Sequence, residues 1–227
     1  RTETTFGDYQ YIASPVAGNT ANNATKIQTV YGWNEVNGSW PTTIITALVS
    51  GRGYNFDQTS SSDGLITFTG GITSSATIPA TSPYKDVLTG TNYSARQYVG
   101  TDGHSGVARS VTNYGGGGWN LLGNPFTSAF NVESFINANL SQFDPNYVAV
   151  YLYDPSVGTH GTYYYIGLPT GWETGLEQTD VQAGQGFFVA AMNDYATFTF
   201  NSTMQEHAPL TAELKSTKST DDRWPGL

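Results

Sequence analysis

The chain has 227 residues, which is enough for one large all-β domain or for two units of about 100 residues each. Its 18 acidic and 9 basic side chains give a formal net charge of −9. An acidic chain without a basic cluster cannot neutralise phosphates, so we expect no nucleic-acid partner. The absence of cysteine excludes disulfides and thiolate metal ligands, and the absence of a run of about 18 apolar residues predicts that no helix spans a membrane.

The composition is typical of an extracellular β protein. The sequence holds 26 glycines and 14% aromatic residues, but only 12% charged residues. Glycine and asparagine suit tight turns, whereas threonine and aromatic residues suit strands. Disordered chains combine low hydrophobicity with high charge, and this pattern is absent. We therefore expect an ordered chain built mainly from strands.

The first half of the chain reads as a series of short strands. Residues 9–13 form the first strand, and Ser14-Pro15 ends it because proline lacks the N–H that a strand ladder needs. Residues 47–50 and 51–56 continue the series, and Asp63-Gly64 turns the chain into a strand at residues 65–69.

The clearest hairpin of the first half joins residues 27–36 to residues 39–45. Its turn is Asn37-Gly38, the pair best suited to the positive φ angles of a type I′ turn. Tyr31, Trp33 and Glu35 show the period of two that is expected of a strand.

The second half repeats this order with longer loops. Residues 119–123 form a strand that Asn124-Pro125 ends, and residues 147–153 and 162–166 form a hairpin. Residues 131–140 form the one convincing helix, with Ser128 or Asn131 as its cap. The apolar face of this helix consists of Val132, Phe135, Ile136 and Leu140.

Matching landmarks occur in the same order in both halves, which indicates a duplicated unit. Pro15 corresponds to Pro125, Tyr31 to Tyr151, and Gly51 to Gly184. We divide the chain into a first β unit at residues 1–100, a second, related unit at residues 101–212, and a tail at residues 213–227 that leads into a downstream domain. Residues 71–106 have no clear place in either unit.

Several segments of the second half resemble a known region of bacterial proteins. They are GWNLLGNPF at 118–126, VYLYD at 150–154, GQGFFV at 184–189, FTF at 198–200 and MQEH at 204–207. The series resembles a duplicated β region of surface and secreted proteins of the Bacteroidetes that the type IX secretion system exports. In those proteins the region lies upstream of a C-terminal sorting domain. The first half, with Ser14-Pro15, YGWN at 31–34 and GRGY at 51–54, looks like the partner unit that often precedes it. The resemblance implies a secreted or cell-surface location and residues with architectural roles.

Aromatic residues are the feature that points most to a binding function. Trp33 and Trp40 flank the predicted tight turn, and Tyr164 and Trp172 occupy the matching region of the second half. Because side chains alternate along a strand, the three tyrosines at 163–165 must place at least one ring on the solvent side. Exposed flat rings stack on sugars, so Trp33, Trp40, Tyr164 and Trp172 are candidate glycan-binding residues. The alternative is that these rings fill the core and cross-strand pairs.

No catalytic arrangement is recognisable in the sequence. His104, His160 and His207 are far apart and lack the spacing of metal ligands. Glu173 and Glu177 lie on a glycine-flanked loop, which gives no reason to expect the two facing carboxyls of a glycosidase. The glycine run at 115–118 lacks the pattern of a phosphate-binding loop. We expect no enzyme, no resident metal and no cofactor, with a Ca²⁺ site built from loop oxygens as the alternative.

These observations together predict an all-β fold of two related antiparallel units, each like a β-sandwich or jelly roll, with one short helix in the second. The function that we expect is that of a non-catalytic module of an exported bacterial cell-surface or secreted protein. Such a module would serve adhesion or present neighbouring domains, and its partner would be a glycan or a surface protein. The first alternative is a carbohydrate-binding module that uses the aromatic residues. The second alternative is a fragment of a polysaccharide-degrading enzyme.

Overall fold

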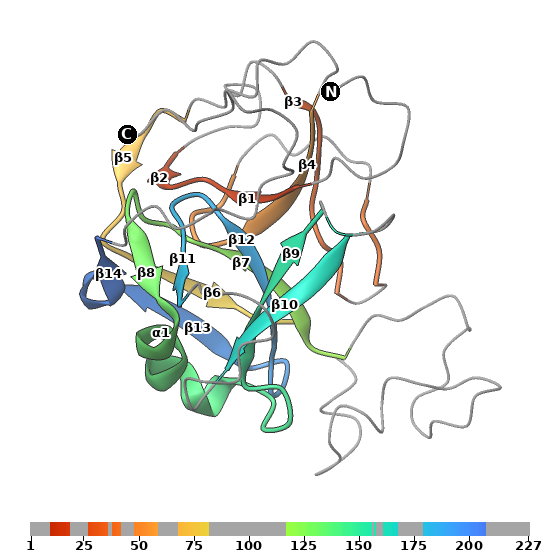
Figure 1. Cartoon of the computed structure of the whole chain (residues 1–227), viewed down its shortest axis with the longest axis vertical. Helices are drawn as coiled ribbons and strands as arrows, with labels where there is room; N and C mark the ends of the chain where they lie inside the picture. The colour runs from red at the N-terminus through yellow and green to blue at the C-terminus, as the bar shows by residue number, and fades with distance from the viewer. Residues whose placement is uncertain are drawn as a thin grey trace, which may run out of the picture.

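A computed structural model describes residues 10–18, 27–35, 38–41, 48–58, 68–81, 117–155, 157, 161–167 and 179–207. Within these ranges the protein consists of short antiparallel strands and one α-helix, which confirms the predicted all-β class (Figure 1). The strands are β1 (Gln10–Ala13), β2 (Val16–Ala17), β3 (Ile27–Tyr31), β4 (Gly53–Gln58), β5 (Gly71–Ile72), β6 (Ser75–Pro79), β7 (Trp119–Gly123), β8 (Ala129–Asn131), β9 (Ala149–Asp154), β10 (Thr162–Gly167), β11 (Asp180–Val181), β12 (Gly186–Ala190), β13 (Thr197–Asn201) and β14 (Gln205–Glu206). The helix is α1 (Val132–Asn139), and two 3₁₀ turns follow at Leu140–Gln142 and Ser202–Met204.

Two sheets with the same internal register form the centre of the molecule. The first unit contributes the sheet β1-β4-β3, and the second contributes β10-β9-β12-β7. In the first sheet the middle strand β4 pairs with β1, which ends at Ser14-Pro15, and with β3, which carries Tyr31. In the second sheet the middle strand β12 pairs with β7, which ends at Asn124-Pro125, and with β9, which carries Tyr151. The residues that lie side by side are Tyr11, Asn55 and Tyr31 in the first sheet, and Leu121, Phe188 and Tyr151 in the second.

The two sheets meet at a joint whose contacts are reciprocal. The backbone N–H of Ala13 donates to the carbonyl of Gly184 at 2.8 Å, and that of Gly123 donates to the carbonyl of Gly51 at 3.0 Å. These are equivalent atoms with the roles of the two units exchanged, as in the self-complementary interface of a two-fold dimer. Two isolated bridges, Ile12–Gln185 and Leu122–Arg52, repeat the exchange one residue further along. The two units therefore pack as a pseudo-symmetric pair within one chain.

The polar residue before Pro15 and the one before Pro125 make the same local hydrogen bond in the two units. Asn124 Oδ1 accepts the backbone N–H of Phe126 at 2.9 Å, and Ser14 Oγ accepts that of Val16 at 3.4 Å. Such side-chain bonds to the residue two positions on are the reason that Asn and Ser favour turns. The Asn124 amide also donates to three carbonyls of the second unit, those of Ser128, Val181 and Gln182.

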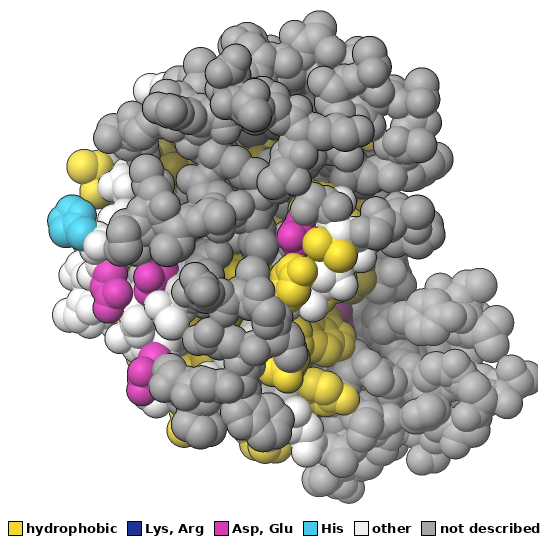
Figure 2. Space-filling model, viewed as in Figure 1, with side chains coloured by type: hydrophobic (Ala, Val, Ile, Leu, Met, Phe, Trp, Pro, Cys, Tyr) yellow, Lys and Arg dark blue, Asp and Glu magenta, His cyan; other side chains and the backbone are white. Residues whose placement is uncertain are grey.

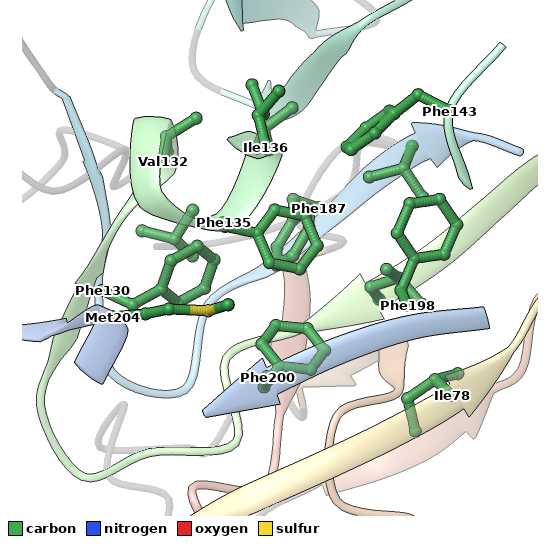
Figure 3. Packing of buried hydrophobic residues seen from close by; sticks show 14 of the residues in the cluster. Ile78, Phe130, Val132, Phe135, Ile136, Phe143, Phe187, Phe198, Phe200 and Met204 are labelled. Carbon is green, nitrogen blue, oxygen red and sulfur yellow. The ribbon is translucent and has the colours of Figure 1, made fainter. Parts of the chain in front are cut away.

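The main hydrophobic core lies in the second unit, between the sheet β10-β9-β12-β7, the pair β13-β6 and α1 (Figure 3). Phe135 of α1 stacks on Phe200 of β13 with ring centroids 4.9 Å apart, and Phe130 and Phe187 approach the same rings. Among the described residues of the first unit a second cluster forms, and its buried members are Ile12, Val30, Leu48, Tyr54 and Phe56. Edge-to-face and offset contacts of this kind add to the stabilisation that burial of the rings provides.

The helix α1 begins as the sequence predicts and ends one residue early. Asn131 caps it, because its side chain accepts the backbone N–H of Ser134 at 2.9 Å. Val132, Phe135 and Ile136 are buried as expected, but Leu140 begins a 3₁₀ turn and is 52% exposed. Its place on the buried face is taken by Asn139, whose amide bonds both the N–H and the carbonyl of Thr199 in β13.

Two segments differ from the expected layout. In the predicted hairpin, Asn34 pairs with Ser39, whereas a two-residue turn at Asn37-Gly38 would pair Val36 with Ser39. Val36 and Asn37 themselves lie outside the described residues. Strand β6, within the stretch that had no clear place, pairs along its whole length with β13 of the second unit. The boundary predicted at residue 100 lies outside the described residues.

In the part of the chain that the structure describes, no helix is long and apolar enough to cross a membrane.

The close approach at the joint predicts the effect of one added methyl group. A Cβ on Gly53 would overlap the Leu122 carbonyl oxygen and the Leu121 side chain, both in the other unit. We expect Gly53→Ala to lower the free energy of unfolding by about 2 kcal/mol, because overpacking at a backbone contact forces the units apart. Gly71→Ala is the matched control, since a Cβ there meets no atom within 4 Å. Urea unfolding of both variants measures the difference, and equal midpoints would contradict the packing of the joint.

Candidate functional site

Six aromatic rings from both units meet beside the joint, and we call them the aromatic cluster. They are Tyr11, Trp33 and Trp40 of the first unit and Tyr153, Tyr163 and Phe188 of the second. Tyr11 stacks on Tyr153 with centroids 5.0 Å apart, and Trp33 meets Phe188 edge-on at 5.4 Å. These separations fall in the range at which aromatic pairs attract one another. The cluster therefore joins the two units through side chains, next to the backbone contacts.

The sequence candidates Trp33 and Trp40 both lie in this cluster, and both are half-buried. Their rings contact each other edge-on at 5.0 Å, and each also contacts Phe188. Much of each indole is consequently used within the molecule. Trp172, the fourth candidate, lies outside the described residues.

The third candidate, Tyr164, lies on the wrong face for this site. It pairs across the strands with Leu152, which is fully buried in the main core. Residues directly opposite in an antiparallel pair share a face of the sheet, so Tyr164 lies on the side of that core. Its neighbour Tyr163 pairs with Tyr153 and takes the place in the cluster. Alternation along β10 predicts that the tyrosines split between faces but does not say which of them faces out.

Tyr163 forms the exposed rim of the cluster. Its side chain is 48% exposed, and hydrophobic side chains come to the surface where β9 and β10 run (Figure 2). The hydroxyls of Tyr163 and Tyr11 hydrogen-bond at 2.6 Å, which ties the rim to the first unit. Burial, with the neighbouring tyrosines, raises the pKa of Tyr11 well above its ordinary value, and burial also raises the pKa of Tyr163. Both hydroxyls therefore stay neutral at physiological pH.

On the other side of Trp33, a buried carboxyl links the units. Glu35 is only 4% exposed; its Oε1 accepts the backbone N–H of Gly118 at 2.5 Å and its Oε2 the indole N–H of Trp33 at 2.9 Å. The backbone amides of Gly117 and Trp119 also bond this carboxyl. Successive backbone N–H groups that converge in this way make an anion-binding concavity. Gly118 has a φ of 101°, a conformation that explains a glycine at this position.

Burial and hydrogen bonding change the pKa of Glu35 in opposite directions. Burial raises its pKa to about 8, while the bonds from Gly118, Trp33 and the adjacent amides oppose that rise. The indole of Trp33 also donates to the carbonyl of Trp119 at 2.6 Å, so one N–H serves both acceptors. Gly117 and Gly118, the described end of the glycine run in which we found no phosphate-loop pattern, thus bind a side chain of the other unit.

No metal centre emerges from the described residues. One pair of acids does face each other there: Asp180 of β11 and Glu206 of β14 flank β8, and burial together with Glu206 raises the pKa of Asp180. No three His, Cys, Asp or Glu side chains among them lie close enough to hold a metal ion. His207 is exposed just after β14. His104, His160, Glu173 and Glu177 lie outside the described residues, so the predictions made for them stay predictions.

Residues 1–222 match the model of a protein family described as "Domain of unknown function (DUF8693)". The chain belongs to the DUF8693 family. Neither a curated protein nor a solved structure matches it. The DUF8693 match spans both halves of the chain.

Three residues of this DUF8693 site were not singled out by sequence reasoning. The sequence places Tyr11 in a strand without a further role and Glu35 only in the alternation of a strand, and it includes Tyr163 in the run of three tyrosines but does not choose it as a binding residue. One feature of the sequence could have indicated Glu35. It is an acidic residue that falls on the same side of the predicted strand as Tyr31 and Trp33, in a chain with few charged residues. No local pattern indicates its partner, because Gly118 is 83 residues away in the sequence.

Truncation of Trp33 tests whether the cluster supports the fold. We expect Trp33→Ala to lower the free energy of unfolding by about 3 kcal/mol, because it leaves a cavity against Phe188 and removes a donor to Glu35. Tyr195→Ala is the matched control: this ring is 83% exposed, so its loss should change stability by less than about 0.5 kcal/mol. Urea unfolding followed by circular dichroism gives both values. A Trp33→Ala midpoint equal to that of the control would show that the cluster is not part of the fold.

Proposed function

We propose that this chain is a non-catalytic module of an exported bacterial cell-surface or secreted protein, where it presents neighbouring domains or takes part in adhesion. The observation that carries the proposal is the use of the aromatic residues: Trp33 and Trp40 pack across the joint and hold two units together. A module that spaces or presents other domains needs units that do not move freely against each other. Reciprocal backbone bonds and a shared ring cluster meet that need.

The exported location rests on sequence features. Few charges and many glycines and aromatic residues suit a β protein outside the cell. The resemblance of residues 118–126 and 184–189 to the region upstream of a type IX sorting domain supports the same location and suggests a member of the Bacteroidetes as the source. An acidic surface also agrees with a protein partner or a neutral glycan better than with nucleic acid.

Labelling of intact cells tests the location. Antibodies raised against residues 1–227 should label intact bacteria that make the full-length protein, or bind the protein in their culture medium. External protease should remove the surface signal and leave a cytoplasmic marker protein intact. A signal that appears only after the cells are permeabilised would refute export.

Carbohydrate binding is the second candidate, and one observation favours it. Tyr163 presents a ring that is 48% exposed at the rim of the cluster, next to the half-buried ring of Tyr153. Exposed aromatic rings beside hydroxyl groups are suited to stacking on a sugar face. The Tyr163 and Tyr11 hydroxyls lie at this rim.

Retention on polysaccharides tests the second candidate with a matched pair of variants. If the rim binds glycans, the protein should be retained by at least one insoluble or soluble polysaccharide, with or without Ca²⁺. Tyr163→Ala should then weaken the binding free energy by about 1–3 kcal/mol. This is the contribution of one aromatic side chain that stacks on a nucleic-acid base, and we take it as the scale for stacking on a sugar. Tyr195→Ala, which removes an exposed tyrosine elsewhere, should bind like the original chain. Equal retention of both variants would show that the rim is not a sugar site.

A further inference from the structure

Two tyrosines from different units meet hydroxyl to hydroxyl at the rim of the aromatic cluster. Tyr11 belongs to β1 and Tyr163 to β10, and their hydroxyl oxygens lie 2.6 Å apart. Their ring centroids are 6.3 Å apart, and their ring planes are tilted by 37°. The two positions are separated by 152 residues in the sequence, so a covalent bond between these side chains would fasten the first unit to the second.

Two phenols that meet in this way can couple when they are oxidised. A tyrosine that loses one electron and its hydroxyl proton becomes a phenoxyl radical, whose unpaired electron is shared with the two ring carbons ortho to the oxygen. Two such radicals combine through these carbons and form dityrosine. The hydroxyls of the product flank the new bond and lie beside each other. The hydrogen bond between Tyr11 and Tyr163 already brings the hydroxyl ends of the two rings together.

Tyr163 is the point at which an oxidant reaches this pair. Its side chain is 48% exposed, whereas Tyr11 is half-buried and stacks on Trp40 with centroids 5.5 Å apart. An electron and a proton can pass between hydrogen-bonded phenols, so a radical formed at Tyr163 can be transferred to Tyr11. Tyr163 is then free to be oxidised a second time. Both oxidation steps therefore enter through one exposed ring.

A third tyrosine, Tyr153, lies close to both rings but is placed less well for coupling. It stacks on Tyr11 with an interplanar angle of 30°, so the faces of these rings meet and not their hydroxyl-bearing edges. Its hydroxyl end lies against Gly161, where an added Cβ would overlap it. Tyr153 also pairs with Tyr163 across β9 and β10, so a bond between these two would stay within one hairpin of the second unit.

We propose that Tyr11 and Tyr163 form an oxidative cross-linking site, at which hydrogen peroxide acting through a peroxidase joins their ortho carbons and locks the two units together. Each tyrosine gives up one electron and one proton. The hydrogens on the coupled carbons then move to the oxygens and restore both phenols. The two electrons and two protons that are removed reduce one hydrogen peroxide to two waters. Because the chain has no cysteine, a disulfide cannot supply such a lock.

The cross-link goes beyond the proposed structural function, and its test uses the purified chain and does not depend on export. A bond between positions 152 residues apart restricts the unfolded chain far more than the folded one, in which the two rings are already in contact. Cross-linked protein should consequently unfold at a higher urea concentration than Tyr163→Phe treated with the same oxidant. An equal or lower midpoint would overturn the lock.

Peptide mapping after oxidation locates the bond. We would treat dilute protein with peroxidase and a short pulse of hydrogen peroxide, isolate the monomer, unfold it and digest it after Lys and Arg. Digestion places Tyr11 in the peptide 2–26 and Tyr163 in the peptide 110–215. We expect these two peptides to be joined, with a mass lower than their sum by two hydrogens, and tandem mass spectrometry should place the link at Tyr11 and Tyr163. Absence of this product overturns the site.

Substitution by phenylalanine keeps each ring and removes the phenol that coupling needs. Tyr11→Phe and Tyr163→Phe should each abolish the joined peptides, whereas Tyr153→Phe should still form them. Tyr195→Phe is the matched control for an exposed tyrosine, since that ring is 83% exposed, and it should also form them. Joined peptides in Tyr11→Phe, or their loss in Tyr153→Phe, would show that another phenol couples and would overturn the assignment. Circular dichroism before oxidation checks the fold of each variant, and if Tyr11→Phe does not fold, the position of the link in the original chain decides.

Discussion

The close approach of two backbones at the joint is the constraint on which the rest of the molecule depends. Ala13 and Gly123 donate to carbonyls of the opposite unit, and this is sterically feasible because the residues at the crossing are small. A Cβ on Gly123 would already overlap the Cβ of Ala13, so a larger side chain at either donor would hold the sheets apart. The distance set here brings the aromatic rings of the two units within contact of each other and lets the backbone at Gly118 reach Glu35.

The two units share a register but have diverged in what they place at equivalent positions. Phe188 stands in the middle strand of the second sheet where Asn55 stands in the first, and Tyr11 of β1 corresponds to Leu121 of β7. The contact between Tyr11 and Phe188 therefore has no aromatic counterpart on the other side of the pseudo-two-fold axis. The backbone joint is symmetric, whereas the ring cluster is one-sided. Function associated with the rings is a property of the pair of units and not of each repeat.

Local sequence signals predicted the elements well and their partners poorly. The proline steps at Pro15 and Pro125 end strands because of a missing donor, and Asn131 caps the helix; both effects act within a few residues. The Asn37-Gly38 signal predicted that Val36 pairs with Ser39, whereas Asn34 is the residue that pairs with Ser39. Trp33 and Glu35, the neighbours of Asn34, contact the other unit. Alternation correctly divided the tyrosines of β10 between two faces, but the choice of Tyr163 over Tyr164 depends on the burial of Leu152, a tertiary fact. The aromatic site was thus half predictable: Trp33 and Trp40 stand out by composition, whereas Tyr11, Tyr163 and Glu35 acquire their roles from residues remote in sequence.

The unequal cores have a consequence for how the chain is made. The first unit contains the small cluster around Phe56, and its rings and its glycine backbone at the joint are covered by residues far along the chain, as the 152 residues between Tyr11 and Tyr163 illustrate. Synthesis starts at the N-terminus, so these surfaces leave the ribosome long before their cover exists. A nascent first half then exposes aromatic side chains and strand edges, which are the features that promote aggregation of incomplete proteins. We infer that this half completes its folding only after Phe188 has emerged.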